Sequence, residues 1–240
     1  MNRSTRIIAK QYIPASWLNF IKKYLFFDVF AVKSYSQEGE DMILRRYFEG
    51  QLTGFYVDIG AHHPKRFSNT YYFYKHGWCG INIDAMPGSM ALFNRVRPRD
   101  INIECAVSLS STDLIYYMFN EPALNGFSKE LSLSRTNSTS DYRIIKEIKM
   151  STRPLCDLLF ENMPEKQKID FMNVDVEGMD LEVLESNDWE KYRPKVVLAE
   201  IFGNSIDELI KKPQTSLMKN KGYRIFAKCY NSVFFEDIFA

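Results

Sequence analysis

Acidic side chains stand at the ends of several short apolar segments of this sequence, where they could bind a cation or accept a proton. Each of these segments has the pattern of a buried strand. The strands of an open parallel sheet end at one edge, and ligands bind in the crevice beyond that edge. We therefore expect one strongly acidic crevice, lined by Asp58, Asp84, Asp175, Glu177 and Glu200.

The loop after the first of these strands, VDIGAHHPKRF, does not suit a phosphate group. A dinucleotide site needs a GxGxxG turn, whose backbone amides approach the pyrophosphate. Here Gly60 is followed by His62 and Lys65 at the other two glycine positions, and Pro64 has no amide to donate. Carboxylates repel phosphates but attract the sulfonium and ammonium groups of S-adenosylmethionine, and Asp84 is placed to accept hydrogen bonds from its ribose hydroxyls.

The polar residues between this strand and the next helix have more than one interpretation. A helix over residues 69–76 would begin next to Ser68, which is a better N-cap than the more distant Asp58. Of the adjacent His62 and His63, at most one is expected to face a ligand, and His63 is a candidate for proton transfer. A histidine that only forms structural hydrogen bonds is the alternative.

Strands and helices alternate along most of the chain. Short apolar strands separated by helices indicate a parallel sheet covered on both faces. The last two strands are joined by a tight turn at Tyr230 and Asn231, so they must be antiparallel. We predict an α/β fold of the class I, Rossmann-like methyltransferase type, with a mostly parallel seven-stranded sheet and a C-terminal antiparallel hairpin. The expected strands are residues 55–59, 80–84, 101–107, 169–174, 195–201, 223–229 and 232–235.

Residues 108–154 form an unusually long connection between the third and fourth strands, and we call them the inserted segment. Two strand-like pieces, 114–119 and 142–150, flank the polar run SLSRTNSTSD, which can bury little and should be mobile. Because the inserted segment leaves the carboxyl edge of the sheet, we predict a substrate lid, with a surface hairpin that has no binding role as the alternative. Its aromatic side chains would either stack on a sugar or form a small core of their own. They are Tyr116, Tyr117, Phe119 and Phe127.

Residues 1–33 differ from the rest of the chain, and we expect them to be an extension of a methyltransferase-like domain that spans residues 34–240. Ser16 could cap an amphipathic helix with Trp17 and Phe20 on its apolar stripe. This basic helix would pack on the main domain or on a second subunit of a homo-oligomer. The alternative is peripheral contact with an anionic membrane surface.

The composition narrows the class of protein and its partners. A chain of 240 residues with 45% hydrophobic content can bury one large core, and a net charge of +1 argues against a nucleic-acid partner. The four cysteines are widely spaced and indicate neither a zinc site nor a disulfide framework. No segment approaches the roughly 18 apolar residues of a membrane span, and a signal peptide is absent from the pattern. We therefore predict a cytoplasmic protein that acts on a small-molecule or glycan acceptor.

Several motifs, taken in order, resemble the FkbM family of S-adenosylmethionine-dependent methyltransferases. They are SQEGED (36–41), VDIGA (57–61), SNT (68–70), GW (77–78), NVDVEGMDLEVL (173–184) and RPKVVLAE (193–200). The resemblance covers residues 34 to 229 or so. It implies a class I fold and methyl transfer to a hydroxyl oxygen, commonly on a sugar or a polyketide-like natural product.

The resemblance also implies roles for particular residues. Asp175 and Glu177, in the DVEG motif, would lie beside the transferred methyl group. Where the family usually has Asn and Gly after the Gly-Ala pair of the first loop, this sequence has His62 and Pro64. Where the family usually has Glu-Pro after the second strand, it has Asp84-Ala85. Together with the neighbouring strand ends and loop, the expected cofactor site comprises Gln37, Asp58, Gly60, Ala61, His62, Ser68, Asn69, Asp84, Ala85, Cys105, Ala106 and Asp175.

Methyl transfer to an alcohol needs a general base or a metal ion, since a protonated hydroxyl is a poor nucleophile. We expect Glu177 or His63 to be the base, with Asp175 as a further candidate, in a site without metal. The alternative is Mg²⁺ held by Asp175, Glu177 and Glu200. Two other classes of function are possible alternatives. One is a non-catalytic Rossmann-like nucleotide-binding module, but its buried carboxylates would then lack a ligand. The other is an NAD-dependent sugar enzyme, which would need the GxGxxG turn that this sequence lacks.

Overall fold

The computed structural model describes residues 14, 16–17, 30–138, 141–203 and 205–240. Contacts within the chain divide it into two compact units, Met1–Lys33 and Ser34–Ala240. The expected N-terminal amphipathic helix lies outside the described residues, except for Ser16 and Trp17. All the elements described below belong to the second unit.

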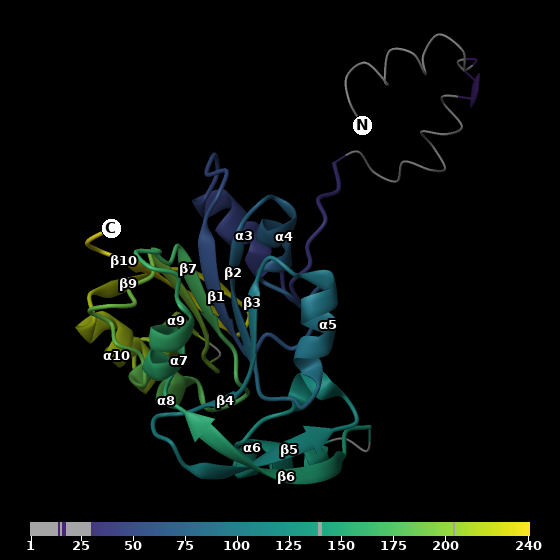
Figure 1. Cartoon of the computed structure of the whole chain (residues 1–240), viewed down its shortest axis with the longest axis vertical. Coiled ribbons are helices and arrows are strands. Elements are labelled where there is room, and N and C mark those ends of the chain that lie inside the picture. Colours follow the sequence, from purple (N-terminus) through teal and green to yellow (C-terminus); the bar gives the residue numbers. More distant parts are fainter. Residues whose placement is uncertain (1–13, 15, 18–29, 139–140, 204) are drawn as a thin grey trace. The chain divides into compact units, whose positions relative to one another are not determined.

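Seven strands form the central sheet of the second unit (Figure 1): β1 (Phe55–Ile59), β2 (Cys79–Asp84), β3 (Ile101–Glu104), β7 (Phe171–Val174), β8 (Val196–Glu200), β9 (Tyr223–Cys229) and β10 (Ser232–Asp237). Their order across the sheet is β3-β2-β1-β7-β8-β10-β9. The first five strands in this order are mutually parallel, and β10 is antiparallel to both of its neighbours. The predicted fold class, with its C-terminal hairpin, is confirmed.

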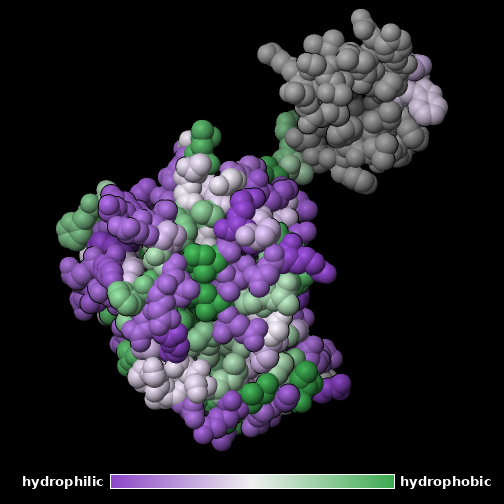
Figure 2. All heavy atoms as spheres, in the orientation of Figure 1, coloured by the Kyte–Doolittle hydropathy of each residue, from purple (hydrophilic) through white to green (hydrophobic). Residues whose placement is uncertain are grey.

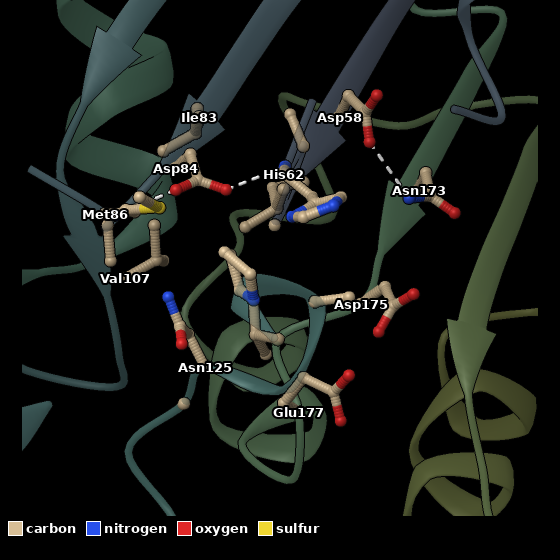
Figure 3. Close-up of a pocket in the computed structure, with 18 of the residues that line it drawn as sticks. Asp58, His62, Ile83, Asp84, Met86, Val107, Asn125, Asn173, Asp175 and Glu177 are labelled. Carbon is tan, nitrogen blue, oxygen red and sulfur yellow. Dashed lines mark hydrogen bonds between the residues drawn. The ribbon is translucent and has the colours of Figure 1, made fainter. Parts of the chain in front are cut away.

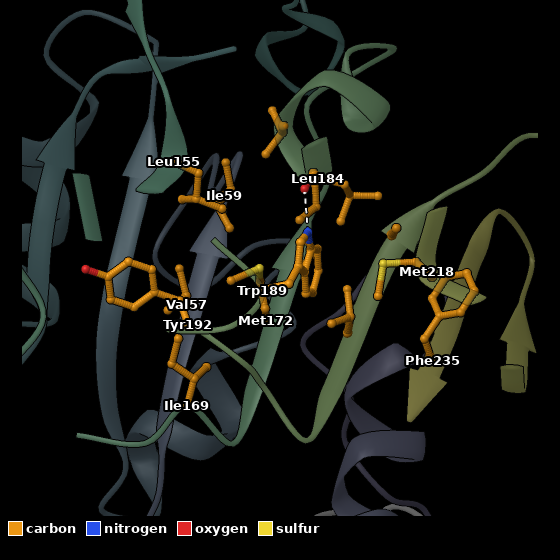
Figure 4. Packing of buried hydrophobic residues seen from close by; sticks show 14 of the residues in the cluster. Val57, Ile59, Leu155, Ile169, Met172, Leu184, Trp189, Tyr192, Met218 and Phe235 are labelled. Carbon is orange, nitrogen blue, oxygen red and sulfur yellow. Dashed lines mark hydrogen bonds between the residues drawn. The ribbon is translucent and has the colours of Figure 1, made fainter. Parts of the chain in front are cut away.

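Alternate residues of each strand enter two separate cores, because successive side chains point to opposite faces of a sheet. On one face, Tyr56 and Phe171 pack with Trp78 and residues of two helices, α3 (Glu40–Tyr47) and α4 (Tyr71–Lys75). On the other face, Val57 and Met172 belong to a larger cluster around Trp189, whose indole N–H donates to the Leu184 carbonyl at 2.9 Å (Figure 4). That cluster includes residues of α7 (Leu155–Asn162), α8 (Asp180–Glu185), α9 (Ile206–Leu209) and α10 (Pro213–Asn220). A further helix, α5 (Ser89–Val96), precedes β3.

The inserted segment forms a small sheet and two short helices rather than a hairpin alone. It contains β5 (Asp113–Phe119), η1 (Pro122–Leu124), α6 (Lys129–Ser138) and β6 (Ile144–Arg153), and β6 lies between β5 and the two-residue strand β4 (Ala106–Val107). The polar run, expected to bury little, is helical as far as Ser138. Most described residues of the run are exposed, as expected, although Ser132 is buried and Arg135 forms an ion pair with Glu177. The mobility of the run stays a prediction.

Two other expected elements differ in extent. The apolar run of residues 101–107 is split after Glu104, because Ala106 and Val107 leave β2 and pair with Thr152 and Arg153 of β6. The helix expected over residues 69–76 begins only at Tyr71, with Thr70 in the N-cap position. Ser68 still contributes to the turn, since its hydroxyl accepts a hydrogen bond from the Tyr71 amide at 3.1 Å.

Hydrophilic residues predominate on the face of the molecule shown in Figure 2, with hydrophobic side chains in smaller patches between them. Within the described part of the chain, no helix has both the length and the apolar character that spanning a membrane requires.

Candidate active site

A cavity lies at the carboxyl ends of β1, β2 and β7 (Figure 3), and residues of the inserted segment also line it. The strand ends converge there, as the parallel sheet requires. His63, Ser68, Ala106 and Glu200 lie outside the lining. The predicted site residues that do line the cavity are Gln37, Asp58, Gly60, Ala61, His62, Asn69, Asp84, Ala85, Cys105, Asp175 and Glu177.

Gly60 is needed where the loops after β1 and β7 touch. Its φ of 80° lies in the left-handed region, and a Cβ added to it would lie 1.7 Å from the backbone oxygen of Asp175. The amides of Gly60 and Ala61 both donate to the carbonyl of Ile83, at 2.9 and 3.1 Å. Because Gly60 has no side chain, the ends of β1, β2 and β7 can approach one another closely at the cavity.

The two adjacent histidines have different environments. Nδ1 of His63 accepts hydrogen bonds from the backbone amides of Lys65 and Arg66, at 3.0 and 2.9 Å, so this ring supports the loop. His62 has a φ of 53° and lines the cavity. Burial lowers the pKa of His62 to about 4, with a further contribution from Arg66, so that its ring is neutral near pH 7. The role of His63 in proton transfer stays a prediction.

Asp84 is held at the end of β2 by two backbone donors. Its Oδ2 accepts from the His62 amide at 2.7 Å and its Oδ1 accepts from the Met86 amide at 2.8 Å. Burial raises the pKa of Asp84, and these two hydrogen bonds oppose the rise. Each carboxylate oxygen has a second acceptor position, so the side chain is oriented and can still accept two hydrogen bonds.

Asp58 belongs to a buried network that links β1, β7 and the SNT motif. Its Oδ1 accepts a hydrogen bond from the side-chain Nδ2 of Asn173 at 2.9 Å, and its Oδ2 accepts one from the Thr70 hydroxyl at 2.7 Å. The Asn69 side chain in turn donates to Oδ1 of Asn173 at 2.9 Å. Burial raises the pKa of Asp58, and the charge of Arg97 opposes the rise. Asn173, which lines the cavity, was not singled out by the sequence.

Arg97 is a second residue that the sequence did not reveal. It is fully buried and forms an ion pair with Asp100 at 2.7 Å. It also donates to the Thr70 hydroxyl at 3.0 Å and to the Tyr56 hydroxyl at 2.8 Å. A buried ion pair needs such additional hydrogen bonds to offset desolvation. Through Thr70, Arg97 supports the Asp58 network from beneath the cavity.

Three carboxylates crowd the ends of β7 and β8. Burial raises the pKa of Asp175 well above its ordinary value, and the charges of Glu200 and Glu177 raise it further. The Asp175 side chain lines the cavity and is exposed there. Burial, followed by the charge of Glu177, raises the pKa of Glu200 to about 8. Oε2 of Glu200 is buried and has no hydrogen-bond partner among the described residues.

Arg135, from α6 of the inserted segment, neutralises one of these acids. Its guanidinium forms an ion pair with Glu177 and also donates to the Leu124 carbonyl at 3.1 Å. Burial raises the pKa of Glu177, and Arg135 opposes the rise. Glu177 is therefore engaged with the inserted segment, whereas no hydrogen bond to the Asp175 side chain is found among the described residues.

The inserted segment packs closely on the strand-end loops. A Cβ at Gly126 would lie 3.1 Å from both Cβ and the backbone oxygen of Glu177. Arg66, in the loop after β1, forms an ion pair with Glu121 at 2.9 Å. Tyr116 and Phe127, two of the aromatic residues expected to stack on a sugar or form a small core, line the cavity. Lining residues from this segment that the sequence did not place in the site are Pro122, Ala123, Asn125 and Gly126.

The cavity is narrow. A water-sized sphere can occupy about 90 Å³, within a depression of about 910 Å³ that includes the open mouth. A site for a drug-sized ligand has at least ~300 Å³, so the cavity has room for such a ligand only together with its open mouth. The inserted segment forms part of the wall, together with the loops after β1 and β2. Its role as a lid stays a prediction that this geometry favours.

No three His, Cys, Asp or Glu side chains in the described ranges are gathered in a way that could hold a metal ion. The expected alternative, Mg²⁺ at Asp175, Glu177 and Glu200, therefore lacks geometric support.

The family model described as the methyltransferase FkbM domain matches residues 58–225. Similar solved structures include a TehB-like SAM-dependent methyltransferase from Corynebacterium glutamicum, with 10% identity, 94% of this chain and 100% of that chain covered, and a TM-score of 0.42. An O-methyltransferase from Bacillus cereus in complex with SAH has 10% identity, 96% and 94% coverage, and a TM-score of 0.41. A precorrin-6y C5,15-methyltransferase from Geobacter metallireducens has 13% identity, 87% and 92% coverage, and a TM-score of 0.44. No curated protein sequence matches the chain.

Proposed function

We propose that this chain, which belongs to the family of FkbM methyltransferases, methylates a hydroxyl group of a sugar, a glycan or a related natural product. S-adenosylmethionine is the cofactor of this family, and when bound it supplies an electrophilic methyl group on a positively charged sulfur. Family membership supports methyl transfer over the two alternatives, an NAD-dependent sugar enzyme and a non-catalytic nucleotide-binding module. The observation that carries the proposal is the group of carboxylates at the ends of β7 and β8.

The residues around the cavity fit this cofactor. Asp84 has two oriented oxygens that can still accept hydrogen bonds, as a ribose diol requires. Asp58 and Asp175 supply negative charge for the sulfonium and ammonium groups. Met86 and Val107 provide apolar surface for an adenine ring.

Asp175 is our choice of general base. It faces the cavity, its pKa is raised, and Arg135 is bound to Glu177 instead. A carboxylate with a raised pKa is a better proton acceptor near neutral pH than an ordinary one. Glu177, one of the two bases favoured by the sequence, would then help to hold the inserted segment closed through Arg135.

A sugar-like acceptor is supported by an exposed aromatic residue in the cavity lining. Phe67 lines the cavity and is 38% exposed, so that its ring can pack on the apolar face of a sugar. All four cysteines are unpaired, which agrees with the reducing cytoplasm in which we place the reaction.

The proposal is tested by incubating the purified chain with methyl-deuterated S-adenosylmethionine and a panel of sugars, nucleotide sugars and glycans, and by detecting labelled products with mass spectrometry. We expect an O-methylated product, and Asp175→Asn should lower turnover about a hundredfold or more while S-adenosylhomocysteine still binds. Glu165→Gln, an exposed acid outside the cavity, is the matched control. Labelled nitrogen or carbon in place of oxygen, or normal turnover by Asp175→Asn, would overturn the assignment.

A further inference from the structure

Asn125, in the inserted segment, has a buried amide donor beside the cavity that is not used by the fold. Its Nδ2 has no hydrogen-bond partner among the described residues, although Asn125 lines the cavity (Figure 3). Buried polar atoms are normally paired, and an exception calls for an explanation such as a missing ligand. The donor therefore points to a hydrogen-bond acceptor that comes from outside the chain.

The orientation of this amide follows from its other atom. Oδ1 of Asn125 accepts a hydrogen bond from the Phe119 backbone amide at 2.7 Å. The reverse orientation would place two donors against each other, so Nδ2 must be the atom that remains unpaired. β5 thus holds Asn125 with its donor fixed.

The surroundings of Asn125 combine polar and apolar groups. Asp84, Tyr116 and Asn125 all line the cavity. Burial raises the pKa of the Tyr116 hydroxyl, the charge of Asp84 adds to the rise, and the Asn125 amide opposes it. The contact between Tyr116 and Asn125 does not reach hydrogen-bond geometry. In Figure 3, Asn125 lies on the same side of the cavity as Met86 and Val107, and Asp58, Asp175 and Glu177 lie on the other.

The chemistry of the cofactor then identifies what faces Asn125. In S-adenosylmethionine the ribose lies between the sulfonium and the adenine. With the ribose hydroxyls at Asp84 and the sulfonium among Asp58 and Asp175, the adenine must lie toward Met86 and Val107. An adenine ring has apolar faces and carries nitrogen acceptors at its edge, as this part of the cavity requires.

We propose that the inserted segment recognises the cofactor rather than the acceptor alone, with the Asn125 side-chain amide donating to a ring nitrogen of adenine. This inference rests on the proposed function, because it takes the cofactor from it. The segment predicted to be a substrate lid is then a cofactor lid as well.

The test measures binding rather than turnover. S-adenosylhomocysteine and its 1-deaza, 3-deaza and 7-deaza analogues are titrated by isothermal calorimetry into the full chain and into two variants, Asn125→Ala and Asn125→Asp. Asn125→Asp keeps an acceptor for the Phe119 amide and lacks the donor, so a loss of affinity in both variants is not explained by disruption of β5. Asn137→Ala, an exposed asparagine of α6, is the matched control.

We expect the unmodified chain to bind one deaza analogue about tenfold more weakly than S-adenosylhomocysteine, which is the effect of one hydrogen bond. Asn125→Ala should bind S-adenosylhomocysteine about tenfold more weakly and should no longer discriminate against that analogue. Equal affinities for the unmodified chain and Asn125→Ala would overturn this inference and leave the proposed function intact. Failure of S-adenosylhomocysteine to bind the unmodified chain would overturn both.

Discussion

Glu200 offers a quantitative test of the carboxylate group at the ends of β7 and β8. In the folded chain burial raises its pKa to about 8, from an ordinary value of 4.5. Between these two values the folded state holds a proton that the unfolded state has released. The stability that this proton gives to the folded chain is fully present below the pKa of Glu200 in the unfolded chain. It is lost as the pH rises through the pKa of Glu200 in the folded chain. Glu200→Gln should remove this loss, because an amide does not ionise.

The size of the effect follows from the shift. Each pKa unit corresponds to about 1.4 kcal/mol, so the difference between about 8 and 4.5 gives an upper bound of ~5 kcal/mol. Neighbouring acids share the protons, and Glu200 is only partly buried, which reduces the expected effect to about 1–2 kcal/mol. Relative to the unmodified chain, Glu200→Gln should therefore gain about 1–2 kcal/mol in unfolding free energy between pH values of about 5 and 8.

The assay is urea denaturation followed by circular dichroism at several pH values between these limits, in the absence of ligand. The control is Glu165→Gln, which removes an exposed acid and should leave the pH dependence unchanged. If the difference in stability between Glu200→Gln and the unmodified chain is the same at every pH, Glu200 ionises normally, and the acidic group does not have the electrostatics described above.

Three further substitutions test the framework around the cavity. Gly60→Ala should destabilise the fold by about 4 kcal/mol or more in denaturant titrations, because its Cβ would overlap the Asp175 backbone oxygen. A stability within error of that of the unmodified chain would contradict the close approach of Gly60 to that oxygen. Arg97→Met should lower the unfolding free energy by about 3–5 kcal/mol, because it leaves a buried acid unpaired. The control Arg46→Met, at an exposed arginine, should lower it by less than about 0.5 kcal/mol. Equal losses in the two variants would show that the Arg97 ion pair is no more important than an exposed one. Asn173→Ala should weaken binding of S-adenosylhomocysteine about tenfold in calorimetry by releasing the hydrogen bond to Asp58, and unchanged affinity would separate that network from the cofactor site.

The sheet and its acidic edge could be predicted from the sequence because both depend on local patterns. Short apolar strands that alternate with helices determine a parallel sheet, and parallel strands bring their carboxyl ends together. Asp58 lies one residue before the end of its strand, Asp84 ends one and Asp175 follows one, so their meeting in one cavity follows from the topology.

Features that depend on distant partners could not be predicted. The split of residues 101–107 is set by pairing with β6, more than forty residues further along the chain. Nothing in the sequence around Arg97 or Asn125 distinguishes a buried side chain from an exposed one. At His62 and His63 the alternation of side chains fails because His62 has a positive φ, so the sequence could not determine which ring faces the cavity.

The most direct test of the central claim compares proton release when S-adenosylmethionine and S-adenosylhomocysteine bind, measured by calorimetry in buffers of different ionisation enthalpy. The two ligands differ by one positive charge at the sulfur. A cation beside Asp175 should lower its raised pKa, so that near neutral pH the binding of S-adenosylmethionine releases more protons than that of S-adenosylhomocysteine. Asp175→Asn should abolish most of the difference. Equal proton release for the two ligands in the unmodified chain, or binding of neither, would contradict the account.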